Sequence, residues 1–311
     1  MLFQYNNHSI FYIMKIKIIT TLLFSSVFAL HAQHLGSEYR LDKVISVAGR
    51  QGIAIDSNYY YVSDSKVLYK YDKQGNMIQK NANPFSNCTL EVNHIGDIDV
   101  WNDEIYCGME YFIDGKGKNI QVGIFDAKSL KYKRALNWEP ESGQVEASGI
   151  AIDREKNQIW MSDWVDSRYV YCYSLETGKY YTKMQCRPVP YWCQGIFIAD
   201  GKMLFSADDG ESTWHIADCI YQADISEVPY TGISNGQCNG AKGGILRLFR
   251  EMKDFRRAGE IEGLAIDPVN DDLVVLNNRG VQIILGMPKG PFKNEGYDKE
   301  VHELYVYKKI R

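Results

Sequence analysis

The sequence predicts an all-β protein, a β-propeller in which four-stranded antiparallel sheets stand in a ring. The first observation is a recurring phrase, Gly-Ile-Ala-Ile-Asp at 52–56 and 149–153, with variants at 96–100, 195–199 and 263–267. The second is that runs rich in Val, Ile, Tyr and Trp, bounded by Gly, Asn and Asp, follow each phrase, which is typical of strands joined by hairpins. The third is the near absence of helical spacing of apolar residues. Only 246–255 allows a helix, and a strand fits there nearly as well.

The spacing of the phrase predicts the number of sheets. The copies begin 44, 53, 46 and 68 residues apart, and each interval can hold one four-stranded blade. The count favours five blades. A six-bladed ring is the main alternative, because the longest interval could contain a degenerate blade, and a β-sandwich with chance repeats is the remaining one. The glycine of each phrase fits a first strand at a narrow axis, where a side chain would clash.

The strands can be assigned in chain order within each blade, with the phrase as the first and innermost strand. Second strands are expected at 59–64, 104–108, 158–163, 202–208 and 272–277. Third strands are expected at 67–71, 121–125, 169–173, 219–223 and 304–307. A glycine turn and a fourth run often close the unit, as at 176–181.

The last blade lacks a strand, and the first residues of the ring supply one. Only two strand runs follow the phrase at 263–267, whereas the run at 39–47 precedes the first phrase and has no partner of its own. Pairing 39–47 beside 304–307 would complete the blade and cover both free sheet edges. The sequence therefore predicts a ring that is closed by its N-terminal strand.

The N-terminal segment is expected to be a signal peptide rather than part of the ring. Lys15 and Lys17 precede an apolar run at 18–30, and Ala32 offers a small residue for cleavage before Gln33. The run is shorter than the roughly 20 apolar residues of a membrane span, and a buried N-terminal helix is the alternative interpretation. Met14 fits a start codon better than Met1. The domains are thus a signal at 1–32 and a single propeller at 33–311, and the location is secreted or periplasmic.

Composition and cysteine content narrow the functional class. The 311 residues carry a formal charge of −4, without the basic surface of a nucleic-acid-binding protein. Seven cysteines cannot all pair within one chain. In an oxidising compartment we expect disulfides between Cys186 and Cys193 and between Cys219 and Cys238. We also expect a monomer.

The phrase Gly-x-Ala-x-Asp, together with Trp-Met-Ser-Asp-Trp at 160–164, resembles propellers of the NHL, YWTD and SMP-30/gluconolactonase type. The resemblance covers most of 39–311 and concerns architecture. Enzymes of the SMP-30 type hold a divalent metal with a Glu at a Glu-Gly phrase, an Asn, and an Asp at a Ser-Asp phrase. Glu262-Gly263, Ser162-Asp163 and Ala207-Asp208 match parts of that pattern. The resemblance implies a Ca²⁺-type site, for which our candidate ligands are Glu262, Asp163, Asp208 and Asn277.

One rim of the ring carries the candidate binding residues. In a propeller, the links into the innermost strands and the links between second and third strands share a rim, so their polar and aromatic residues meet at the channel mouth. The ligand-binding candidates are Gln51, Glu146, Trp164, Trp192, Gln194, Trp214, Asn278 and Arg279. The alternative for each Asp and Asn is a local role, in which the side chain caps a turn after its strand.

The longest insertion, at about 209–244, is either a binding loop or a surface excursion. If the chain is a hydrolase, Asp209 or His215 is the expected general base. Our first functional expectation is a small-molecule or carbohydrate-like ligand, or a protein partner, held at the channel mouth. The alternative is a metal-dependent lactonase- or esterase-like hydrolase.

Overall fold

A computed structural model describes residues 33–210, 216–225, 244–255, 259–279 and 300–311. Residues 33–311 form one compact unit. The predicted signal segment, as well as Trp214, His215 and Cys238, lies outside the described residues. In the described part of the chain no helix has the length and apolar character needed to cross a membrane.

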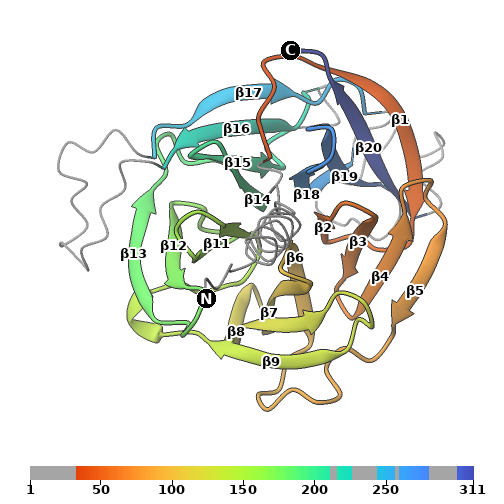
Figure 1. Ribbon diagram of the computed structural model, residues 1–311. Helices are drawn as coiled ribbons and strands as arrows, with labels where there is room; N and C mark the ends of the chain where they lie inside the picture. The colour runs from red at the N-terminus through yellow and green to blue at the C-terminus, as the bar shows by residue number, and fades with distance from the viewer. Residues whose placement is uncertain (1–32, 211–215, 226–243, 256–258, 280–299) are drawn as a thin grey trace, which may run out of the picture. The chain divides into compact units, whose positions relative to one another are not determined.

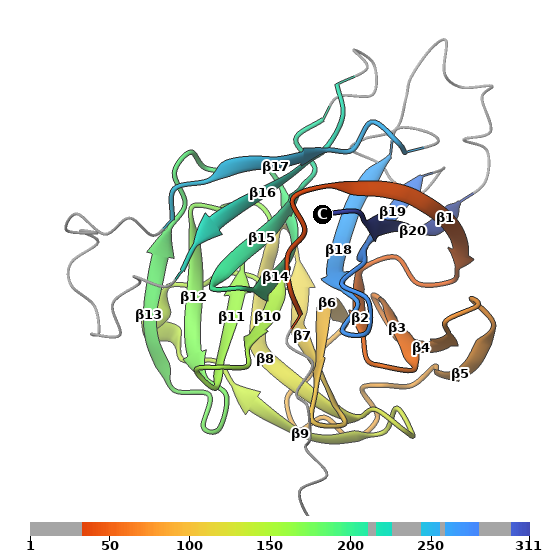
Figure 2. The ribbon, with the colours of Figure 1, turned by 45° about the horizontal axis from the view of Figure 1, so that its top comes forward.

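Five four-stranded antiparallel sheets form a ring, which confirms the predicted β-propeller with five blades (Figures 1 and 2). The first blade consists of β2 (Gly52–Ile55), β3 (Tyr59–Asp64), β4 (Val67–Asp72) and β5 (Met77–Asn81). The second consists of β6 (His94–Trp101), β7 (Glu104–Ile113), β8 (Lys116–Asp126) and β9 (Tyr132–Asn137). The third consists of β10 (Ile150–Asp153), β11 (Gln158–Ser162), β12 (Tyr169–Ser174) and β13 (Tyr180–Gln185).

The fourth blade consists of β14 (Cys193–Ala199), β15 (Lys202–Ala207), β16 (Cys219–Asp224) and β17 (Arg247–Glu251). The segment 246–255, for which the sequence allowed a helix or a strand, thus contains the edge strand β17. The fifth blade consists of β18 (Glu260–Ile266), β19 (Leu273–Arg279), β20 (Val301–Lys309) and β1 (Tyr39–Val47). The described residues include one short 3₁₀ helix, η1 (Pro140–Ser142).

The N-terminal strand closes the ring as predicted. β1 is the outermost strand of the fifth blade and pairs with β20 from Tyr39 opposite Lys309 to Val47 opposite His302. Ile45 packs in one core cluster with Tyr305 and Tyr307. The first and last described segments of the ring are therefore held in the same sheet (Figure 1).

The core of the protein lies between neighbouring blades. One hydrophobic cluster joins the first and second blades, another the second and third, a third the third and fourth, and the largest joins the fourth, fifth and first. The inner strands of each blade are therefore buried on both faces of the sheet. This explains why the innermost strands are apolar at nearly every position rather than at alternate ones, as in β2, where all four residues are buried.

Glycines allow the innermost strands to meet at the axis. A Cβ atom on Gly195 would lie 2.7 Å from Gly263 Cα, and one on Gly52 would lie 2.6 Å from Asp97 Cα. The space that these glycines leave is filled by the Asp97 side chain, which is 1% exposed. Its carboxyl accepts hydrogen bonds from Ile98 N (2.9 Å) and from Ile196 N (3.3 Å) of the fourth blade.

The second blade differs from the predicted alignment of the repeat. The sequence phrase places Gly96 in register with the other glycines. In the structure, Gly96 and Asp97 form a bulge between the pairs Ile95–Met109 and Ile98–Cys107, so Asp97 stands at the axial position. Burial raises the pKa of this carboxyl well above its usual range, and the second blade thereby contributes an acid where the other four blades have the glycine of the repeated phrase.

The predicted disulfides are not formed by the described cysteines. Cys186, Cys193 and Cys219 all have free thiols. The Cys193 sulfur lies 3.7 Å from the Gly195 carbonyl oxygen of its own strand, and the Cys219 sulfur lies 3.7 Å from the carbonyl oxygen of Ala217. Cys186 and Cys193, the first predicted pair, are both buried in the core between the third and fourth blades, and their thiols are free in this structure.

Candidate functional site

Polar residues of the first three blades contact one another across the blade boundaries. The His94 ring nitrogens lie 3.1 Å from Gln51 Oε1 and 3.3 Å from Glu110 Oε1. Glu110 is fully buried, and its other oxygen accepts a hydrogen bond from Ala147 N (2.8 Å) in the link that leads to β10. One chain of polar contacts thus connects the first three blades.

In the third blade, the carboxyls of Glu146 and Asp163 each accept a hydrogen bond from a backbone amide in the other residue's link. Asp163 Oδ1 accepts a hydrogen bond from Glu146 N (3.0 Å), and Glu146 Oε2 accepts one from Trp164 N (2.8 Å). Tyr171 donates its hydroxyl to Asp163 Oδ2 (3.0 Å). Burial, followed by the charge of Glu110, raises the pKa of Glu146 to about 8, and burial raises that of Asp163 to about 7. Both carboxyls therefore titrate near neutral pH, a property that is common at functional sites.

The pKa of Glu146 predicts a specific pH dependence of stability. An unfolded Glu titrates near pH 4.3, so between about pH 4 and pH 8 the folded chain holds a proton that the unfolded chain releases. The free energy of unfolding that this group contributes is therefore fully present below about pH 4 and is lost as the pH rises from about 4 through 8. In Glu146→Gln the side chain cannot ionise. Relative to wild type, we expect this variant to gain about 2–4 kcal/mol of unfolding free energy between pH 5 and pH 8.

Urea unfolding at several pH values measures this gain. Glu176→Gln, which changes an exposed acid in the turn after β12, is the matched control and should follow the wild-type curve. Parallel stability curves for Glu146→Gln and wild type from pH 5 to pH 8 would contradict the assigned pKa.

A second group of acids lies where the fourth and fifth blades meet. Asp208 and Asp218 share a side-chain hydrogen bond, and burial together with their mutual proximity raises the pKa of Asp208. Glu260 accepts a hydrogen bond from Gln194 Nε2 (2.8 Å) and interacts electrostatically with both aspartates. We refer to Asp208, Asp218 and Glu260 as the acid group.

Glu262 lies near the acid group, and its carboxyl accepts a hydrogen bond from its own blade. Glu262 Oε1 accepts a hydrogen bond from Asn278 Nδ2 (2.6 Å), which also lies 2.6 Å from the Arg50 carbonyl oxygen. Burial, followed by the charge of Glu260, raises the pKa of Glu262 well above its usual range. His302 Nδ1 lies 2.9 Å from Asn278 Oδ1 and extends the network to β20.

Two tryptophans form the aromatic part of the rim. The rings of Trp164 and Trp192 lie 4.8 Å apart at 47°. Trp192 is 38% exposed and has a φ of +56°, a region that bulky residues rarely adopt. Such strained backbone conformations cluster at functional sites. The neighbouring Tyr191 is 71% exposed, so the link that leads to β14 presents aromatic surface to solvent.

The predicted metal ligands do not form one donor set. Both oxygens of Asp163 already accept hydrogen bonds, and Glu262 is bonded to Asn278. In the parts of the chain that the structure describes, no three His, Cys, Asp or Glu side chains gather in a way that could hold a metal ion. Glu262, Asp163, Asp208 and Asn277 therefore do not fit a Ca²⁺ site in this conformation, and we assign no chemistry to a metal.

Two further candidates have partners that the sequence did not indicate, and three residues near them were not among the candidates. Asp209, the described candidate for a general base, accepts a hydrogen bond from the Tyr221 hydroxyl. Arg279 Nη2 lies 3.7 Å from Glu303 Oε1. Sequence reasoning missed Asp218 and His302, because it took candidates from the ends of the second strands, whereas these two residues lie at the starts of third strands. Glu260 was missed although it lies two residues before Glu262, on the same side of an extended strand.

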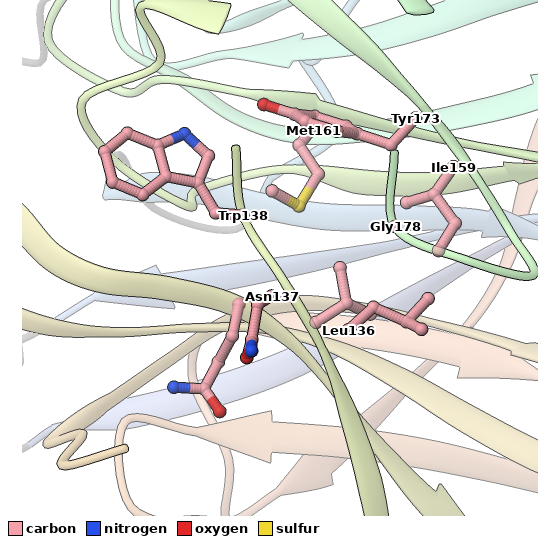
Figure 3. A pocket seen from close by; sticks show the side chains of 9 residues that line it. Leu136, Asn137, Trp138, Ile159, Met161, Tyr173 and Gly178 are labelled. Carbon is pink, nitrogen blue, oxygen red and sulfur yellow. The ribbon is translucent and has the colours of Figure 1, made fainter. Parts of the chain in front are cut away.

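Two cavities lie away from these rim residues. One is a narrow apolar gap in which Leu136 and Trp138 of the second blade face Met161 and Tyr173 of the third (Figure 3). The other is a groove of about 520 Å³ between residues 35–39 and the fourth blade, whose lining includes Lys202 and Arg250. Neither cavity is lined by the rim residues described above.

Comparison with known proteins supports the fold. No protein-family model and no curated protein matches the sequence. Among solved structures, Myxococcus xanthus glutaminyl cyclase is similar, with 9% identity and a TM-score of 0.53 over 86% of this chain and 96% of that one.

A luciferin-regenerating enzyme is also similar, with 14% identity and a TM-score of 0.49 over 85% of this chain and 96% of that one. The PQQ-bound aldose sugar dehydrogenase of Streptomyces coelicolor is similar with 12% identity and a TM-score of 0.43 over 88% of this chain and 99% of that one. The strand topology shows that the chain is a β-propeller with five blades closed by its N-terminal strand, and the likeness to the glutaminyl cyclase supports this fold.

Proposed function

We propose that this β-propeller binds a small polar, carbohydrate-like ligand at the mouth of the ring. The observation that carries the proposal is the set of buried carboxyl, amide and imidazole contacts within and between neighbouring blades, together with a tryptophan pair of which Trp192 is exposed. Burying carboxyls at this density costs stability, and such a cost is typical of sites that act on a ligand. Sugar rings present apolar C–H faces that stack on aromatic rings and hydroxyls that bond to acids and amides.

The aromatic pair gives the first test. Truncating Trp192 to Ala removes the exposed ring of the pair, so the affinity for a sugar ligand should fall about tenfold, or about 1.4 kcal/mol. Isothermal titration calorimetry with a panel of mono- and disaccharides measures the dissociation constants. Trp138→Ala is the matched control, because that ring lies in the gap between the second and third blades. Equal affinities of Trp192→Ala and wild type for every bound sugar would contradict the proposed site.

A hydrolase is the second candidate function, and the Asp208–Asp218 pair favours it. Two neighbouring carboxyls that share a proton can act as general acid and general base, as paired carboxyls do in other enzymes. Asp218→Asn would keep the shape of the pair and remove one titrating group. Loss of hydrolysis in this variant on an ester, lactone and glycoside panel, with sugar binding retained, would support catalysis.

We also propose that the chain is exported. The basic start and short apolar run at 15–30 support this proposal. Cell fractionation and N-terminal sequencing test it, with a mature terminus expected at Gln33. The Ca²⁺ expectation is tested separately, by melting scans in chelator and in added Ca²⁺.

A further inference from the structure

The groove between the fourth blade and the segment that leads to β1 is separate from the residues of the rim. Its volume of about 520 Å³ falls within the range of about 300–1,000 Å³ that is usual for small-molecule sites. One wall is the chain from Leu35 to Tyr39, and the floor consists of residues from β15, β16 and β17. Figures 1 and 2 show this segment running along the fourth blade. Every residue that lines the groove belongs to the described part of the chain.

Contacts of the Leu35–Tyr39 segment bound the groove at both ends. At one end, Leu35 N donates a hydrogen bond to Asp200 Oδ2 (2.7 Å), and Asp200 Oδ1 lies 2.8 Å from His34 Nδ1. At the other end, Arg250 Nη1 donates to the Tyr39 carbonyl oxygen (2.9 Å). The groove therefore has a finite length, which suits a short ligand better than a long chain that passes through it.

A cation without a partner lies at the Leu35 end. Lys202 is exposed at the start of β15, and its Nζ forms no ion pair or hydrogen bond with another described residue. Both oxygens of the nearby Asp200 are already engaged by His34 and Leu35. Asp224 is opposite Lys202 in the pairing of β15 with β16, but it does not line the groove. Lys202 therefore offers its ammonium to a negatively charged group of a ligand.

The Tyr39 end carries the opposite charge. The side chain of Glu38 is 58% exposed, and the one cation near it among the described residues is Arg311, whose Nε lies 3.9 Å from Glu38 Oε2. Exposed ion pairs of this kind are weak, so the carboxylate is available to a positively charged group. Arg250 also lies at this end, but its Nη2 donates to Asp254, which compensates its charge.

Polar and apolar side chains lie between the two charged ends. Ser37 is in the middle of the wall, and Gln222 is on β16, the middle strand of the floor. Neither side chain has a hydrogen bond to another described residue. A hydroxyl and a carboxamide each offer a donor and an acceptor, and a peptide group needs both. Leu248, which is 52% exposed, adds an apolar position for a side chain.

We propose that the groove binds a short unblocked peptide, with its C-terminal carboxylate at Lys202, its N-terminal ammonium at Glu38 and its peptide groups over the residues between them. Leu35 and Glu38 are three residues apart, at most about 11 Å along the chain, and an extended tripeptide covers the same span. A zwitterionic ligand matches both ends, whereas a simple anion or cation would leave one end unpaired. This inference concerns a second site and does not rest on the proposed ligand at the mouth.

Calorimetry with four forms of one tripeptide, Ala-Leu-Ala, tests the inference in the wild-type protein. The forms are the free peptide, the N-acetylated peptide, the peptide amide and the peptide blocked at both ends. We expect the free peptide to bind most tightly, with a loss of about fivefold for each blocked end, the magnitude of an exposed ion pair. Equal affinities of the free and the doubly blocked peptide would overturn the inference, and so would the absence of binding by all four forms.

Two substitutions of exposed side chains locate the ends of the peptide. Lys202→Gln should abolish the advantage of the free carboxylate over the amide and keep that of the free ammonium, whereas Glu38→Gln should do the reverse. Lys179→Gln, which changes an exposed lysine just before β13, is the matched control and should behave as wild type. If Lys202→Gln and Glu38→Gln kept the wild-type order and ratios of the four affinities, the groove would not be the peptide site.

Trp192→Ala separates this inference from the proposed function. Trp192 does not line the groove, so the affinity for the free tripeptide should stay within twofold of wild type while the affinity for a sugar falls. Loss of peptide binding in Trp192→Ala would assign the peptide to the mouth and overturn the groove as its site. The comparison of the four peptide forms needs no variant, so the inference can be refuted even if a substituted chain fails to fold.

Discussion

A chain that begins at Ala48, without β1, is expected to lose cooperative folding. β1 supplies the outermost strand of the fifth blade through eight residue pairs with β20. It also contacts the neighbouring blades, because Arg250 Nη1 donates to the Tyr39 carbonyl oxygen (2.9 Å) and Lys43 Nζ donates to the Lys73 carbonyl oxygen (2.9 Å). Folded domains are stable by only about 5–15 kcal/mol, so the loss of a strand that bridges three blades should exceed that margin.

Circular dichroism and size-exclusion chromatography of chains that begin at Gln33 and at Ala48 measure this effect. We expect a sharp thermal transition for the longer chain and a broad one, with aggregation through the uncovered β20 edge, for the shorter. A synthetic peptide of residues 33–47, added in trans, should restore the transition. Within the full strand, Ile45→Ala should destabilise by about 2–4 kcal/mol, whereas Asp42→Ala, at an exposed position, serves as the control. A cooperative transition of the shorter chain within a few degrees of the longer would contradict this role.

The closing strand shows why the architecture could be predicted from sequence. The run at 39–47 has no blade of its own, and the last blade lacks a fourth strand. Pairing the two is predicted because an exposed sheet edge leaves backbone hydrogen-bonding groups unpaired. The count of five follows from the same repeats, since the long interval before Gly263 contains β17 and residues outside the described part rather than a described sixth sheet. Repeats and strand patterns are local properties, and a single chain displays them directly.

The partners of the site residues could not be predicted in the same way. Asp163 directly follows β11, and its oxygens accept hydrogen bonds from the Tyr171 hydroxyl and from backbone amides. Which donor reaches a buried carboxyl depends on link conformations that the sequence does not display. The register at Asp97 depends in turn on a bulge, which shifts the residues by one and moves a different side chain to the axis. Cys186 and Cys193 are close in sequence, and both thiols are free in this structure.

Adding a single methyl group at the axis is expected to have the second largest effect. In Gly195→Ala, the new Cβ would lie 2.7 Å from Gly263 Cα and 3.0 Å from Ser206 Oγ. The first of these atoms belongs to the backbone of another blade, so relief requires the innermost strands to separate. Because all blades meet at this axis, movement of one strand disturbs Asp97 and its hydrogen bond from Ile196 N. We expect a loss of about 3 kcal/mol or more, at the upper end of overpacking costs.

Gly108→Ala separates this axial crowding from the general effect of replacing a glycine in a strand. Gly108 lies in β7, and a Cβ there would meet the Ala147 carbonyl oxygen at 3.4 Å and Ala147 Cβ at 3.5 Å, which is ordinary packing distance. Alanine also restricts the unfolded chain more than glycine does, so this variant should stay within about 1 kcal/mol of wild type. Urea unfolding of both variants gives the comparison. If Gly195→Ala were no less stable than Gly108→Ala, the axis could widen without cost, and the requirement for glycine at the innermost strands would have to come from something other than contact between blades.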